Sequence, residues 1–236
     1  MLPEALYKWR MDMINIAVDG PAGAGKSTIA KMVAKDLDYI YVDTGAMFRA
    51  IGLYMIRKGV DLSDEQGISL AVEEADVDLR YIDGVQCVFL NGSNVNDMIR
   101  TDEVSDAASK VAVVPAVRSK MLKLQRNIAS GNNVIMDGRD IGSKVLPDAD
   151  LKIYLTASVE ERARRRYKEN IEKGLKCDLE TIKAEIKERD HRDMTRQEAP
   201  LVRVDDARLV DSSDMTIEEA VRTIEDMIDE VISSRQ

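Results

Sequence analysis

A glycine-rich loop constrains this chain more than any other feature of its sequence. Residues 20–27 read Gly-Pro-Ala-Gly-Ala-Gly-Lys-Ser, between the apolar run 14–18 and a helical pattern that starts near Ile29. In a strand–loop–helix setting, the backbone N–H groups of such a loop curl around phosphate oxygens at the positive end of the helix. The sequence therefore predicts a P-loop that binds a nucleoside triphosphate.

The side chains that close the loop have separate expected roles. Lys26 reaches the β and γ phosphates, the Ser27 hydroxyl ligates Mg²⁺, and Thr28 adds a second hydroxyl on the same turn. The predicted triphosphate-binding residues are Gly20, Pro21, Ala22, Gly23, Ala24, Gly25, Lys26, Ser27 and Thr28.

The rest of the chain alternates apolar runs with helical patterns. The runs that favour strands cover residues 14–18, 39–42, 134–136, 151–155 and 209–210. Capping boxes begin two of the helices, one at Ser158 and Glu161 and one at Thr216 and Glu219. Such alternation predicts an α/β protein with the three-layer P-loop fold, whose central parallel sheet has about five strands.

One stretch breaks the alternation. Two short β-prone runs, 77–82 and 85–90, flank Asp83-Gly84, which favours a tight hairpin turn. We therefore predict an inserted subdomain at residues 63–118, with a small antiparallel sheet and helices. The core domain is predicted at 13–62 and 119–236, with a helical lid at about 160–199 and an N-terminal tail at 1–12.

Arginines and carboxylates gather where strands should end. Asp43 to Arg49 follows the second run, Asp137 to Asp140 follows the third, and both should emerge beside the P-loop. Farther along, Arg189, Arg192 and Arg196 are spaced to share one helical face. Guanidinium groups suit phosphoryl transfer, because they neutralise the charge of the transition state, and a closing lid excludes water. From the residues alone, the acceptor is a small anionic molecule.

Composition limits location and partners. The 236 residues carry a net charge of −9, which disfavours a general nucleic-acid binder. No apolar segment approaches the roughly 20 residues that cross a bilayer, and residues 1–10 do not resemble a signal peptide. The two cysteines have no metal-site or disulfide spacing. We expect a cytoplasmic monomer without membrane or nucleic-acid partners.

Other P-loop proteins need elements that the sequence lacks. A GTPase switch would carry an Asn-Lys-x-Asp element, and a clamp ATPase would carry a Leu-Ser-Gly-Gly-Gln element; neither occurs. Kinases for UMP, AMP or shikimate stay open as alternatives within the same class.

From Ile14 to Ile232 the chain resembles the bacterial cytidylate kinases. The resemblance rests on 20–27, Asp43-Thr44-Gly45, Ile99-Arg100-Thr101, Val117-Arg118, Asp137-Gly138-Arg139-Asp140 and the run 188–196. It implies Mg²⁺-dependent transfer from ATP to CMP and dCMP, directly in line. The insertion also fits, since bacterial members carry an enlarged monophosphate-binding region.

The resemblance also implies roles for single residues. CMP would be bound by Thr44, Arg49, Ser109, Arg118, Arg139, Asp140, Arg189 and Asp193, and ATP also by Arg165 or Arg166. Among these, Ser109 and Asp140 match residues that meet the cytosine amino group, and Arg118 matches the donor to the ring acceptors. The matching catalytic set is Lys26, Arg139, Arg189 and Arg196. One departure is Phe48, where the family commonly has tyrosine.

Overall fold

The computed structural model describes residues 13–82 and 84–235, so the predicted tail at 1–12 lies outside the described residues. The described residues form two compact units, 13–41 with 131–235 and 42–130 without residue 83. No helix among the described residues is long and apolar enough to cross a membrane.

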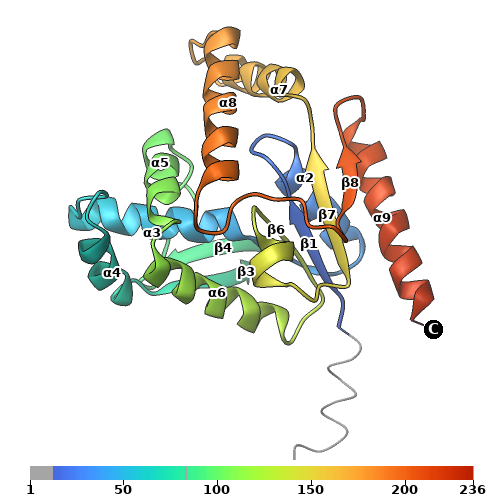
Figure 1. Ribbon diagram of the computed structural model, residues 1–236, viewed down its shortest axis with the longest axis horizontal. Helices are drawn as coiled ribbons and strands as arrows, with labels where there is room; N and C mark the ends of the chain where they lie inside the picture. Colours follow the sequence, from blue (N-terminus) through green and yellow to red (C-terminus); the bar gives the residue numbers. More distant parts are fainter. Residues whose placement is uncertain (1–12, 83, 236) are drawn as a thin grey trace, which may run out of the picture. The chain divides into compact units, whose positions relative to one another are not determined.

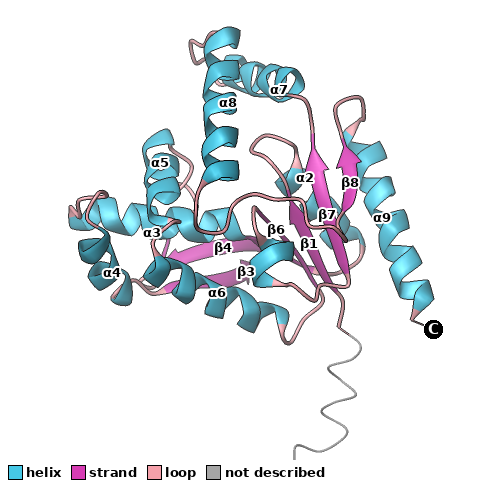
Figure 2. Ribbon diagram, in the orientation of Figure 1, coloured by secondary structure: helices cyan, strands magenta, loops and turns pink. Residues whose placement is uncertain are grey.

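A five-stranded parallel sheet forms the centre of the fold (Figures 1 and 2). The parallel sheet of about five strands was predicted, and its strands run in the order β2-β6-β1-β7-β8. Their bounds are β1 Asn15–Asp19, β2 Ile40–Asp43, β6 Val134–Gly138, β7 Leu151–Thr156 and β8 Arg208–Asp211. The last residue of β1 is in register with Gly138 of β6 and Tyr154 of β7. Segments that follow these three strands therefore leave the sheet at one edge.

Two helices of the first unit pack with the sheet residues in one apolar core. They are α2 (Lys26–Asp36) and α9 (Ile217–Ser234), and residues such as Val33 and Ile224 are fully enclosed with Ile16 and Leu155. Burial of such side chains is the main favourable term in folding, at about 25 cal/mol per Å² of apolar surface.

Helix ends follow the sequence with one exception. The capping box at Thr216 and Glu219 is present, with bonds of 2.8 and 3.1 Å. At α7 (Val159–Glu172), Ser158 accepts from the N–H of Glu161, but the second half of the predicted box is wrong. The Glu161 carboxylate pairs with Arg165 instead, and the Ser158 N–H donates to Ser213.

The predicted lid forms a pair of helices. Helix α7 packs against α8 (Leu179–Thr195) through a small apolar cluster of Ala163, Ile182 and Ile186. In Figure 1 the two helices lie side by side, and β7 leads into α7.

The second unit holds the predicted hairpin. Strands β3 (Val77–Ile82), β4 (Val85–Leu90) and β5 (Ser93–Asn94) form an antiparallel sheet, with Ile82 opposite Val85. The helices of this unit are α3 (Thr44–Lys58), α4 (Glu65–Glu73), α5 (Asp102–Val111) and α6 (Pro115–Ala129). Because α3 and α6 pack on this unit's other elements, the unit is wider than the insertion predicted at 63–118.

A close helix crossing marks this unit. A Cβ added to Gly52 of α3 would lie 2.8 Å from the backbone nitrogen of Ala108 in α5. The two helices therefore approach backbone to backbone, which only glycine allows at this position.

Candidate active site

Two glycines give the P-loop its shape. Gly20 has φ +150°, and a Cβ there would lie 1.9 Å from the carbonyl oxygen of Leu155. Gly25 has φ +90° and caps α2 in the left-handed region that side chains disfavour. Both positions exclude other residues, which explains the glycine spacing.

Lys26 is buried at the start of α2, where its Nζ donates to the carbonyl of Pro21 at 2.8 Å. Burial, together with the charges of Arg139 and Arg189, lowers the pKa of Lys26 from 10.5 to about 7, against the opposing charges of Asp137 and Asp19. The ammonium therefore lies among arginines from two other segments. Such a concentration of positive charge suits a polyanionic ligand.

A carboxylate stands beside the predicted metal ligand. The Ser27 hydroxyl donates to Oδ2 of Asp137 at 2.8 Å, and the Tyr41 phenol donates to Oδ1 at 2.8 Å. Asp137 and Tyr41 are both buried. A hydroxyl next to a carboxylate offers the hard oxygen donors that Mg²⁺ prefers, so these residues fit the predicted cation.

Asp19 belongs to the site although the sequence analysis did not single it out. Its two carboxylate oxygens accept from the N–H groups of Ile141 and Gly142, each at 2.8 Å. These two residues begin the short helical turn η1 (Ile141–Val145), directly after Arg139 and Asp140. Burial raises the pKa of Asp19 to about 6, against those two hydrogen bonds. One side chain thus joins the start of the P-loop to the predicted acceptor segment.

The predicted acceptor residues of the first unit meet in a charged cluster. Nε of Arg139 donates to Asp193 at 2.9 Å, and Nη1 of Arg196 lies 3.9 Å from the other carboxylate oxygen. Burial disfavours the Asp193 carboxylate, but the charges of Arg139, Arg189 and Arg196 hold its pKa below the ordinary value. Asp140, next to Arg139, is buried. The structure therefore brings together residues that lie 54 positions apart.

The predicted face of three arginines on one helix is wrong in detail. Arg192 is 54% exposed, with Nε 3.8 Å from Oε1 of Glu188. Arg196 follows the end of α8 in extended backbone, and its Nε donates to the carbonyl of Ala199. The cluster forms because the chain turns after Thr195, which helical spacing does not reveal.

Residues from the C-terminal half hold the P-loop in place. The Arg162 guanidinium donates to the carbonyl of Ala22 at 3.0 Å, and the Ser212 hydroxyl donates to that of Ala24 at 3.2 Å. Arg165 donates to the Ser212 carbonyl at 2.7 Å, and its Nη1 would lie 3.8 Å from a Cβ on Gly25. Of the predicted lid arginines, Arg165 is therefore placed beside the loop, and Arg166 is half-buried. Neither Arg162 nor Ser212 carries a local sequence signal.

The second unit positions the other predicted residues. Asp43 caps α3 by accepting from Ala46, and it pairs with Arg49 at 3.1 Å, directly beside the buried Thr44. The Arg118 guanidinium lies 5.9 Å from the ring centre of Phe48, which is half-buried.

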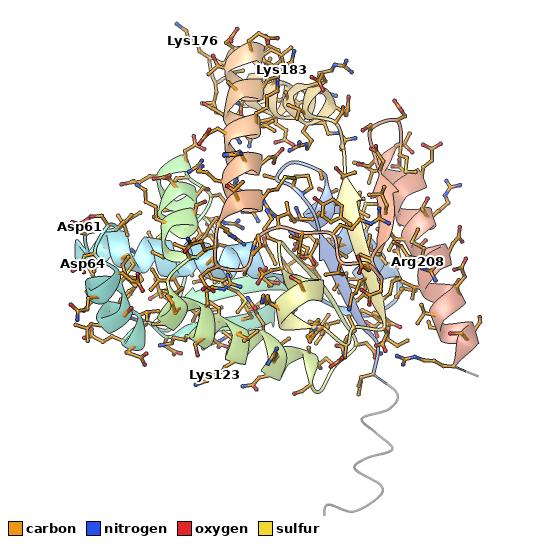
Figure 3. All side chains as sticks on the ribbon, in the orientation of Figure 1. Asp61, Asp64, Lys123, Lys176, Lys183 and Arg208 are labelled. Atoms are coloured by element: carbon orange, nitrogen blue, oxygen red, sulfur yellow. The ribbon has the colours of Figure 1, made fainter. Side chains whose placement is uncertain are left out.

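Ser109, also in this unit, lies on α5, and its hydroxyl donates to the carbonyl of Ser105 at 3.1 Å. All side chains of the described residues are drawn in Figure 3.

Known proteins match this chain along most of its length. The family model described as cytidylate kinase matches residues 16–230. A cytidylate kinase of Pediococcus pentosaceus is 51% identical over 209 residues, which cover 89% of this chain and 92% of that protein. One of Pelotomaculum thermopropionicum is 52% identical over 211 residues, which cover 89% and 93%. A crystal structure of an uncharacterized protein from Eubacterium ventriosum has a TM-score of 0.52 at 13% identity, over 92% of this chain and 99% of that chain, which is a likeness of fold alone.

Proposed function

Since the chain belongs to the cytidylate kinase family, we propose that it transfers the γ-phosphoryl group of ATP directly to CMP or dCMP. The products are ADP and CDP or dCDP. One observation supports this proposal: Arg139, Asp193 and Arg196 form a charged cluster in the unit that carries the P-loop.

The triphosphate is assigned to residues 20–28, with Arg165 and Arg166 contributing from α7. Lys26 places its charge on the β and γ phosphates, where the phosphates replace the Pro21 carbonyl as its partner. Ser27 and Asp137 would hold Mg²⁺, which when bound neutralises phosphate charge and orients the γ-phosphoryl group.

The residues assigned to the acceptor nucleotide are carried over one by one from the family resemblance. Arg49, Arg139 and Arg189 bind the CMP phosphate, and Asp193 meets the sugar hydroxyls. Ser109, Asp140 and Arg118 meet cytosine, and Thr44 lies in the same binding segment as Arg49. A carboxylate that accepts from the cytosine amino group would face a carbonyl in UMP, and such unpaired buried groups reject the wrong substrate by large factors.

The transfer needs no covalent enzyme intermediate. A phosphate oxygen of CMP attacks the γ phosphorus while the bond from that phosphorus to the bridging oxygen of ADP breaks. Negative charge spreads over the equatorial oxygens in the transition state, where Lys26, Arg139, Arg189 and Arg196 stabilise it.

We further infer a cytoplasmic monomer whose substrates are ATP and CMP or dCMP, without nucleic acid or membrane. The net charge of −9 supports the absence of a nucleic-acid partner. We keep the assignment of residues 63–118 to acceptor binding and of 160–199 to a lid. Light scattering after gel filtration should give the mass of one chain, 26.4 kDa.

The first test is ADP release from ATP and Mg²⁺ with CMP, dCMP, UMP, AMP, shikimate or no acceptor. ADP should form with CMP and dCMP and hardly at all in the other wells. Faster ADP release with UMP, AMP or shikimate than with CMP would show that the acceptor is wrongly assigned. An equal rate in every well would indicate a nucleotide hydrolase and refute the kinase proposal.

A further inference from the structure

Arg162 binds three segments of the first unit through one guanidinium group. Its Nε donates to the carbonyl of Ala157, at the end of β7, at 2.9 Å. Its Nη1 donates to Ala22 of the P-loop at 3.0 Å. The terminal nitrogens also form a two-pronged pair with Asp190 of α8, at 3.1 and 2.6 Å. The side chain is 4% exposed, so water does not compete for these bonds.

The stem of the same side chain supports the P-loop. A Cβ built on Gly23 would lie 3.5 Å from Cβ of Arg162 and 3.9 Å from its Cδ. The loop backbone therefore rests on the methylene groups while Ala22 accepts from the head group. A shift of Arg162 would move the loop that is assigned to ATP.

Asp190 connects this support to the acceptor residues. It directly follows Arg189 and lies one helical turn before Asp193, so α8 carries all three residues together. The apolar cluster of α7 and α8 ends at Ile186, one helical turn or about 6 Å before Asp190 at 1.5 Å per residue. Figure 3 labels Lys176 and Lys183 at the outer end of this helix pair. The ion pair thus fixes the inner end of α8, where the apolar contacts stop.

A buried ion pair is weak evidence for a stabilising role. The free energy needed to remove two charges from water is about as large as the attraction between them. Apolar replacements of such pairs therefore often leave stability unchanged or increase it. An apolar pair, however, does not fix the relative orientation of its two side chains. The planar guanidinium group does, because its two parallel hydrogen bonds set the angle and distance of the carboxylate.

From these contacts we propose that Arg162, with Asp190, is a positioning residue that holds the arginine-bearing end of α8 at a fixed separation from the P-loop. The inference rests on the proposed kinase function, since that function requires γ-phosphoryl donor and acceptor phosphate to be aligned within about 1 Å. Arg162 is not among the residues assigned to either substrate.

The test separates alignment from stability. Replacing both partners, R162M with D190L, keeps the apolar stem over Gly23 and leaves no unpaired buried charge. We expect its melting temperature to stay close to that of the wild type, because the relieved desolvation cost of the ion pair is offset by the loss of the hydrogen bonds to Ala157 and Ala22, while kcat falls about 100-fold. The KM values for ATP and CMP should stay within about threefold, because each site still binds its own substrate. The conservative variant R162K should lower kcat as well, since a lysine ammonium cannot form the fork.

The matched control is R164M, on the same helix, because Arg164 is 70% exposed and pairs with Glu161 at the surface. It should have wild-type kcat and KM values. A folded R162M/D190L enzyme with kcat within about threefold of the wild type would overturn the inference and leave the kinase function intact. A wild-type enzyme that transfers nothing to CMP would refute the proposed function and this inference with it.

Discussion

The hydroxyl of Ser27 lies 2.8 Å from Oδ2 of Asp137, although the two residues are 110 positions apart. Parallel pairing of β1 with β6 produces this contact, since the P-loop and Asp137 leave neighbouring strands at the same edge. The Tyr41 phenol orients the carboxylate from its other side.

Changes at Asp137 should alter the requirement for Mg²⁺. D137N keeps an acceptor for Ser27 but removes the charge that favours a cation, so the Mg²⁺ concentration for half-maximal rate should rise about tenfold or more. Y41F, which removes one orienting hydrogen bond, should give a smaller rise, and Y39F should give none. Mn²⁺ binding in the presence of ADP, followed by electron paramagnetic resonance, gives the affinity without turnover. Unchanged Mn²⁺ affinity in D137N would contradict the assignment.

Replacing Lys26 should lower activity and should change how the stability of the protein depends on pH. With its pKa lowered from 10.5 to about 7, the unfolded chain binds a proton that the folded protein lacks throughout this window. The titration of Lys26 therefore increases the free energy of unfolding as pH rises from 7 to 10.5. K26M should lose about 10²- to 10³-fold in kcat. At pH 7 its free energy of unfolding should exceed that of the wild type. This difference, the K26M gap, should close towards pH 10.

Urea unfolding of both proteins at several pH values measures that gap. The exposed K35M variant, on the same helix, serves as the control, with a constant difference from the wild type. A gap for K26M that stays constant from pH 7 to 10 would contradict the lowered pKa.

The titration of Asp19 should lower stability as pH rises, which is opposite to the effect of Lys26. Its pKa is raised from 3.8 to about 6, so between these values the folded protein binds a proton that the unfolded chain has released. Its contribution to the free energy of unfolding is therefore complete below pH 3.8 and is lost as pH rises through 6. D19N cannot titrate and loses one acceptor, so its deficit in stability should be larger at pH 4.5 than at pH 7. Equal deficits at both values, measured by urea unfolding, would rule out the raised pKa.

Gly52 should be essential to the second unit. G52A places a Cβ 2.8 Å from the backbone of Ala108, next to Ser109, so α5 must move. We expect a loss of about 1–3 kcal/mol in unfolding free energy and a higher KM for CMP with the KM for ATP unchanged. G131A is the control, because a Cβ at Gly131 meets nothing within 4 Å. A G52A enzyme that binds CMP normally would show that α5 absorbs the methyl group.

Binding of both substrates should close the enzyme around them, since water must be excluded from the transferring group. Hydrogen exchange followed by mass spectrometry should show slower exchange in residues 160–196 and 63–118 with ADP and CMP bound. The helix α9 provides an internal reference. Unchanged exchange in both segments would contradict closure.

Much of the fold could be predicted from local pattern, and most of the missing part has a common physical cause. Apolar runs and turn residues located all five central strands and the hairpin, because each depends on neighbours in sequence. The pairing of Arg162 with Asp190 and the role of Asp19 were not found, since their partners lie 28 and more than 120 positions away. The capping position at Glu161 has a different, local cause, because Glu161 pairs with Arg165 one turn later on the same helix face.

The hydrogen bond from Ser212 to Ala24 has a consequence for the order of events during synthesis. The serine leaves the ribosome 188 residues after the alanine that it binds. A growing chain therefore displays its complete nucleotide-binding motif long before it contains the residues that brace it. A truncated product that ends before Ser212 would carry the glycine-rich motif without this hydrogen bond.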